Sequence, residues 1–120
     1  MKYKEWLFEW LIVYKKNNIK EKTYQKYQQI ITKHLEKGLG EYNLNDLTPI
    51  IIQKYITELS ERGNLKNGRG LSPNTVEGII IVIRNSLSMA YNLGLQLLFL
   101  RLYLGIILFH FLNFLFLIVR

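Results

Sequence analysis

The chain of 120 residues is long enough for one small domain with a modest hydrophobic core. It has no cysteine, which excludes disulfides and thiolate metal sites. Its formal net charge of +7 indicates a polyanionic partner, either a nucleic acid or an anionic membrane surface, unless the charge only keeps the surface soluble.

The first predicted helix covers residues 3–14, where apolar side chains recur at helical spacing. Its apolar face contains Trp6, Leu7, Trp10, Leu11 and Tyr14. Lysines and asparagines follow at positions 15–18. They suit a helix end, because cations favour the C-terminus and Asn readily leaves the helical conformation.

The second predicted helix, residues 20–37, has a basic face opposite an apolar one. The apolar face contains Tyr24, Tyr27, Ile31, His34 and Leu35. At 100° per residue, the opposite face contains Lys22, Lys26, Gln29, Lys33 and Lys37. Gly38 and Gly40 then end the helix as C-cap residues would. A solvated helix face and a DNA-binding surface both explain the lysines.

Two pairs of a hydroxyl residue and proline mark the starts of two further helices. The first pair, Thr48 and Pro49, begins a helix with the core face Ile52, Tyr55, Ile56 and Leu59. The second pair, Ser72 and Pro73, begins a long helix with the apolar stripe Val76, Ile79, Ile80, Ile83, Leu87, Ala90 and Tyr91. Between them, three glycines and three cations at positions 62–70 predict a flexible loop. No strand alternation is found, so the sequence predicts an all-α fold.

These elements carry short motifs in a recognisable order. The tryptophan-bearing first helix precedes Thr-Tyr-x-x-Tyr at 23–27, and Leu-x-x-Leu-Thr-Pro at 44–49 leads into Ile-x-x-Tyr-Ile at 52–56. A basic glycine loop precedes Leu-Ser-Pro-Asn-Thr at 71–75, and the last helix ends in Ala-Tyr-Asn-Leu-Gly at 90–94. In this order and spacing, residues 4–94 resemble the core-binding, SAM-like domain at the N-terminal side of phage integrases and other tyrosine recombinases.

The resemblance implies an orthogonal four-helix SAM-like bundle that forms one half of a clamp around a recombination site. It also implies that the second and fourth helices face double-stranded DNA. Together with the basic face, this gives the expected DNA-binding residues Lys20, Lys22, Thr23, Lys26, Lys33, Lys66, Arg69, Ser72, Asn74, Thr75 and Arg84. We expect mainly phosphate contacts, with Asn74 or Arg84 as the candidates for a base edge. Ser72 and Thr48 are equally explained as helix caps.

Catalysis is not expected of this chain. The family attacks DNA with a tyrosine and stabilises the phosphate with arginines, histidines and a lysine, all in a C-terminal domain. Nothing after Gly94 supplies that set. We therefore expect a truncated, cytoplasmic recombinase module with no catalytic residues, no metal site and no cofactor. His34 and His110 lack neighbours at metal-ligand spacing, and His34 is interpreted as a boundary or core residue.

Residues 95–120 differ from the rest of the chain. Residues 1–94 hold 14 of the 16 Lys and Arg residues and all nine acidic residues, so their net charge is 14 − 9 = +5. We therefore predict two parts, a DNA-binding domain over 1–94 and an apolar, helical tail over 95–120.

Three interpretations of the tail stay open. It is a frameshift product, a bilayer span over 102–119 made costlier by His110 and Asn113, or an apolar helix that folds back or self-associates. The alternative function is accordingly a small tail-anchored membrane protein with a basic cytoplasmic head.

Overall fold

The computed structural model describes residues 1–64 and 66–95, and these form a helical bundle. The helical elements are α1 (Tyr3–Glu9), η1 (Trp10–Lys15), α2 (Glu21–Ile30), η2 (Ile31–Leu35), α3 (Glu36–Gly38), η3 (Leu44–Asp46), α4 (Pro49–Arg62) and α5 (Pro73–Asn92). Within these ranges the β-structure is limited to an isolated bridge between Lys2 and Asn43. The prediction of an all-α fold is confirmed.

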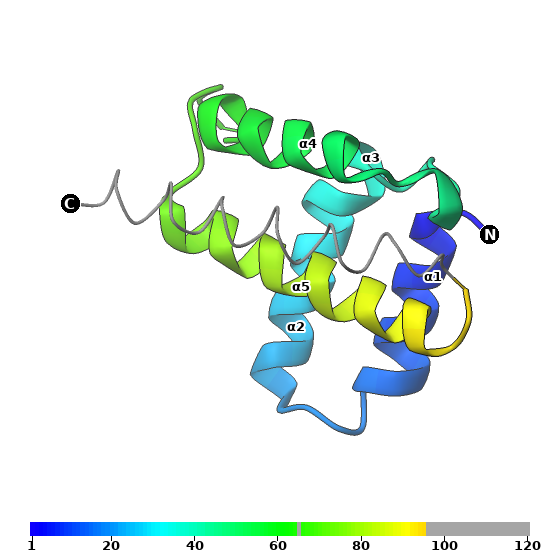
Figure 1. Cartoon of the computed structure of the whole chain (residues 1–120). Coiled ribbons are helices and arrows are strands. Elements are labelled where there is room, and N and C mark those ends of the chain that lie inside the picture. The colour runs from blue at the N-terminus through cyan, green and yellow to red at the C-terminus, as the bar shows by residue number, and fades with distance from the viewer. Residues whose placement is uncertain (65, 96–120) are drawn as a thin grey trace.

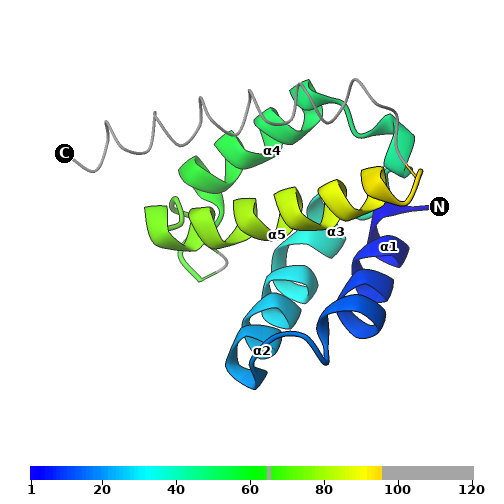
Figure 2. The same ribbon diagram turned by 60° about the horizontal axis from the view of Figure 1, so that its bottom comes forward.

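The arrangement is a helical hairpin crossed by a long helix. α1 with η1 and α2 with η2 run antiparallel, and α5 passes across both (Figure 1). α4 lies alongside α5, on the side of α5 opposite the hairpin formed by α1 and α2 (Figure 2). α5 therefore contacts α1, α2 and α4, and its buried stripe forms the centre of the core.

The first helix buries four of its five predicted apolar residues and half-buries Tyr14, but it changes its hydrogen-bond pattern halfway along. Trp6, Leu7, Trp10 and Leu11 are all buried. From Trp10 the helix is π-helical, with bonds from residue i+5 to residue i, and Lys16 N–H donates to Leu11 O at 2.9 Å.

The second helix shows the same change at η2, and its glycines have a different role from the predicted one. Ile31 and Leu35 are buried as predicted, together with Ile30, which the prediction missed. The helical run does end at Gly38, but neither Gly38 nor Gly40 adopts a positive φ. Instead, a Cβ at Gly38 would clash with the Tyr55 ring, and one at Gly40 with the Glu36 carbonyl. Close packing, not a left-handed cap, requires these glycines.

Both predicted N-caps are confirmed. The Thr48 hydroxyl accepts a hydrogen bond from Ile51 N–H at 3.3 Å, and the Ser72 hydroxyl accepts one from Thr75 N–H at 3.3 Å. The C-terminal stop is confirmed as well, because α5 ends at Asn92 and Gly94 has a φ of 78°.

A buried polar contact joins the start of α1 to α5. The Tyr3 hydroxyl and Ser86 Oγ are 2.7 Å apart, and Trp6 Nε1 donates to Ser86 O at 2.8 Å. Ser86 Oγ also donates to Ile83 O at 3.1 Å, so each polar atom here has a partner. Burial raises the pKa of the Tyr3 hydroxyl, which therefore stays neutral and hydrogen-bonded.

The predicted bilayer span at 102–119 lies outside the described residues. None of the helices that the structure describes combines the length and apolar character that crossing a bilayer requires.

Candidate nucleic-acid interface

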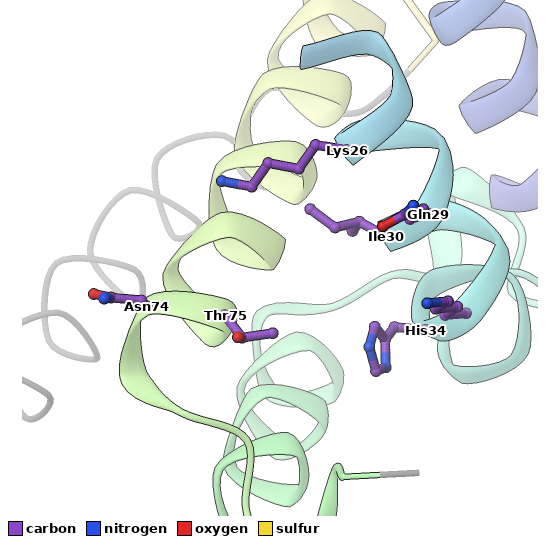
Figure 3. A pocket seen from close by; sticks show the side chains of 7 residues that line it. Lys26, Gln29, Ile30, His34, Asn74 and Thr75 are labelled. Atoms are coloured by element: carbon purple, nitrogen blue, oxygen red, sulfur yellow. The ribbon is translucent and has the colours of Figure 1, made fainter. Parts of the chain in front are cut away.

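A groove lies between the second helix and the beginning of α5. Its volume is about 340 Å³, and it is open to solvent. The lining residues come from α2, η2 and the first turn of α5 (Figure 3): Lys26, Gln29, Ile30, Lys33, His34, Asn74 and Thr75. Four of the predicted DNA-binding residues, Lys26, Lys33, Asn74 and Thr75, are thus brought together from two distant parts of the sequence.

Ile30 fixes the wall formed by the second helix. Its side chain is 7% exposed and extends towards α5, which sets the orientation of its neighbours (Figure 3). Lys26, one turn earlier, and Lys33, three residues later, are exposed. The amphipathic pattern of the sequence explains this wall, because burying Ile30 and Ile31 leaves the lysines facing solvent.

The other wall is the capped N-terminus of α5. The Ser72 cap holds the first turn, and its hydroxyl lies 2.9 Å from Thr75 Oγ1. Thr75 extends towards α2, whereas the Asn74 amide points away from it (Figure 3). The N-terminus of a helix carries a partial positive charge, so this wall adds to the positive potential of the lysines.

Gly78 lies where the two walls of the groove come together. It is buried inside α5, and a Cβ there would lie 3.5 Å from Lys26 Cε and 3.7 Å from Ile30 Cδ1. The aliphatic part of Lys26 therefore lies against the α5 backbone, while its ammonium group stays exposed.

The lysines of the groove are not neutralised within the described part of the chain. The ion pairs found there join Lys2 and Lys4 to Glu41, and Arg62 to Glu58 and Glu61. None of the residues that line the groove is acidic. Cations without a protein counter-ion produce a surface that attracts anions.

His34 and Gln29 also line the groove, although neither was a predicted binding residue. His34 is half-buried, and this burial lowers its imidazole pKa, with a smaller contribution from the Lys33 charge. A sequence signal for it exists, because Lys26, Ile30 and His34 follow one another at intervals of four residues, which places them on one helix face. The interpretation as a boundary residue captured its partial burial but not its place in the groove.

The other seven predicted residues lie outside the groove lining, within the described ranges. Lys20 is the N-cap residue of α2, and Lys22 and Thr23 are in its first turn. Lys66 and Arg69 are exposed in the loop before α5, where their backbone N–H groups donate to the side chains of Asn64 and Asn67. Ser72 is the cap of α5, and Arg84 is exposed about 14 Å along the axis from Thr75.

The described residues offer no metal site, since no three His, Asp or Glu side chains lie close enough together to hold an ion.

The comparison with protein families identifies the first half of this structure. Residues 2–60 match the family model described as phage integrase, N-terminal SAM-like domain. This part of the chain is an N-terminal SAM-like domain of the phage integrase type. This confirms both the resemblance to tyrosine recombinases and the SAM-like fold of the bundle.

The match bears on the groove in one further respect. It includes the helical hairpin and most of α4, so the integrase domain contributes the lysine-bearing wall. The wall formed by α5 lies beyond the matched residues. No curated protein and no solved structure matches the chain.

Proposed function

We propose that this chain is a DNA-binding module that contacts duplex DNA through the groove between α2 and α5, without catalysing strand exchange. The observation that carries the proposal is the pair of lysines, Lys26 and Lys33, that face the N-terminus of α5 with no carboxylate in the groove. We place the module in residues 1–94 and its site of action in the cytoplasm.

The lysine spacing suits a DNA backbone. Lys26 and Lys33 are separated by about 10 Å along the helix axis. That distance is about three times the rise of 3.4 Å between successive charges of one DNA strand. The two ammonium groups can therefore neutralise phosphates of one strand while the N-terminus of α5 contacts a neighbouring one.

The contact is expected to depend on charge more than on base sequence. Lysines and helix N-termini recognise phosphate, which carries no sequence information. The remaining expected contacts, at Lys20, Lys22, Thr23, Lys66, Arg69, Ser72 and Arg84, would extend the same surface along the DNA. Duplexes of shuffled sequence should therefore compete almost equally for the protein.

The test is the salt dependence of duplex binding in the variant Lys26→Glu/Lys33→Glu. Each phosphate contact contributes about 0.9 to the slope of log K against log salt, so losing two should reduce the slope by about 1.8. The measurement is fluorescence anisotropy of a labelled 30-base-pair duplex at several salt concentrations. Lys54→Glu is the control for charge reversal outside the groove, since Lys54 is exposed on α4 and its substitution makes the same change of charge as either single substitution in the groove.

Three results would contradict the proposal in different ways. Unchanged binding by the double variant, with its helical circular dichroism intact, would show that the groove is not the contact surface. Absence of duplex binding by the unmodified protein at low salt would rule out the DNA-binding function itself. Nicked or covalently attached DNA after incubation would contradict the non-catalytic part of the proposal.

A further inference from the structure

The imidazole of His34 lies in the groove at a position where its proton would contact a bound phosphate. It lies two turns after Lys26 on the same wall, and its ring is on the groove side of η2 (Figure 3). Thr75 extends towards this wall from the other side. An anion held between the lysines and the N-terminus of α5 would therefore lie beside the imidazole.

The groups around His34 leave its proton without a counter-charge in the free protein. From its own helix, Lys26 and Lys33 contribute positive charges to the groove. From α5, the lining residues Asn74 and Thr75 are uncharged. Burial and the Lys33 charge both disfavour the imidazolium, which is why the pKa of His34 lies below its usual value.

We propose that His34 is a proton-dependent DNA contact, so that acidification tightens the hold of the groove on a backbone phosphate. The inference rests on the proposed function, since the phosphate supplies the negative charge that the groove lacks. A protonated imidazole has two N–H donors, and a charge-assisted bond to a phosphate oxygen is stronger than a neutral one.

The direction of the effect follows from linkage. A phosphate beside His34 favours the imidazolium, so the pKa of His34 is higher in the complex than in the free protein. Binding then takes up a proton between those two pKa values, and affinity rises as the pH falls through that interval. For one proton, the steepest change is about tenfold in affinity per pH unit. Above the interval the affinity is constant, and below it the affinity is constant again at a higher level.

The experiment measures the affinity of the full chain for a 30-base-pair duplex from pH 5 to 8 at constant ionic strength. The unmodified protein should bind several-fold more tightly at the acidic end. His34→Gln should bind with one affinity across the range, because an amide does not titrate. His110→Gln is the matched control, since it removes the other histidine of the chain and should keep the pH dependence.

A second measurement does not depend on any variant folding correctly. The imidazole resonances of His34, titrated by NMR with and without the duplex, should show a higher pKa in the complex. An unchanged pKa on binding would overturn the inference, as would a His34→Gln protein that keeps the full pH dependence. In both cases salt-dependent binding through Lys26 and Lys33 would still stand, so the proposed function would survive. Loss of all duplex binding by the unmodified protein would overturn both.

Discussion

The two ends of α5 make contacts of opposite character. Near the C-terminal end of α5, Ser86 forms hydrogen bonds with Tyr3 and Trp6 at the start of α1. The start of α1 is also bound by the Glu41 carboxylate and by the backbone carbonyl of Gly40. We call this the closed end. At the N-terminal end, α5 faces Lys26 and Lys33 across the groove, where none of the lining residues is a carboxylate. The closed end satisfies its polar groups internally and so stabilises the fold, whereas the groove leaves its charges available to a partner.

Alanine substitutions of two glycines should show the difference between these two ends most clearly. Gly40→Ala at the closed end places a Cβ against the Glu36 backbone and should destabilise the fold by about 1–3 kcal/mol. Gly78→Ala beside the groove meets only ordinary contacts and should stabilise the fold by about 0.5–1 kcal/mol, because glycine is unfavourable inside a helix. Urea unfolding of both variants measures the difference. Equal effects of the two substitutions would contradict the contrast between the ends.

The next effect concerns the buried hydroxyl at the closed end. Ser86→Ala leaves the Tyr3 hydroxyl buried without this partner and should lower the free energy of unfolding by about 1–3 kcal/mol. Tyr3→Phe removes the other partner, so the loss in the double variant should be smaller than the sum of the two single losses. A double-mutant cycle measured by urea unfolding checks this, and strict additivity would argue against the pairing. Duplex binding by the folded variants should stay unchanged.

The groove should respond in the opposite sense, with an effect on binding and little on stability. Lys26→Met keeps an unbranched apolar stem against Gly78 and Ile30 but removes the charge. Its unfolding free energy should change by less than about 0.5 kcal/mol, as for most surface substitutions. The slope of log K against log salt for the duplex should fall by about 0.9. A large loss of stability would show that the Lys26 charge supports the fold.

A smaller effect is the acid sensitivity of the closed end. Hydrogen bonds from Lys2 and Lys4 hold the pKa of the Glu41 carboxyl at about 2, below its usual 4.5. The stability from this group is therefore complete above pH 4.5 and is lost as the pH falls towards 2. Thermal unfolding between pH 2 and 6 should show this loss in the unmodified protein and a weaker one in Glu41→Gln. Because the pair is exposed, high salt should reduce the difference.

His34 gives the groove its own, separate interval of pH. Its pKa is lowered in the folded protein, so the unfolded chain binds a proton more readily just below pH 6.5. Stability should therefore decline as the pH falls from about 6.5 to the folded pKa of His34. His34→Gln should remove this decline and leave the one due to Glu41.

The local features of this structure could be predicted from the sequence. Proline after Thr48 and after Ser72 located two helix starts, and periodicity located the buried faces around Trp6 and Ile52. These features depend on neighbouring residues, so a linear pattern reveals them. The basic face of the second helix was predicted for the same reason, and the described lysines on it are exposed.

The features that the sequence did not reveal depend on packing between distant segments. Gly38 looked like a helix cap, but the Tyr55 ring, which belongs to α4, requires it to be glycine. Likewise, Lys26 lies against α5 at Gly78, and nothing near either residue in the sequence indicates that pairing. Periodicity placed His34 on the apolar face of its helix. Its place in the groove was not predictable, because α5 forms the other wall. The exposure of the candidate lysines was therefore predictable, whereas the convergence of four candidates on one groove was not.

The π-helical turn η2 has a consequence for insertions and deletions. This wide turn lies between Lys26, which precedes it on α2, and Leu35, which is buried at its end. A π-turn accommodates one residue more than an α-helical turn while the helix on either side keeps its orientation. Deleting the exposed Thr32 should therefore restore ordinary α-helical bonding and leave Lys26 facing α5 and Leu35 in the core. A deletion in the regular helix before η2 has no wide turn to absorb it, and should rotate the preceding residues relative to Leu35 by about 100°.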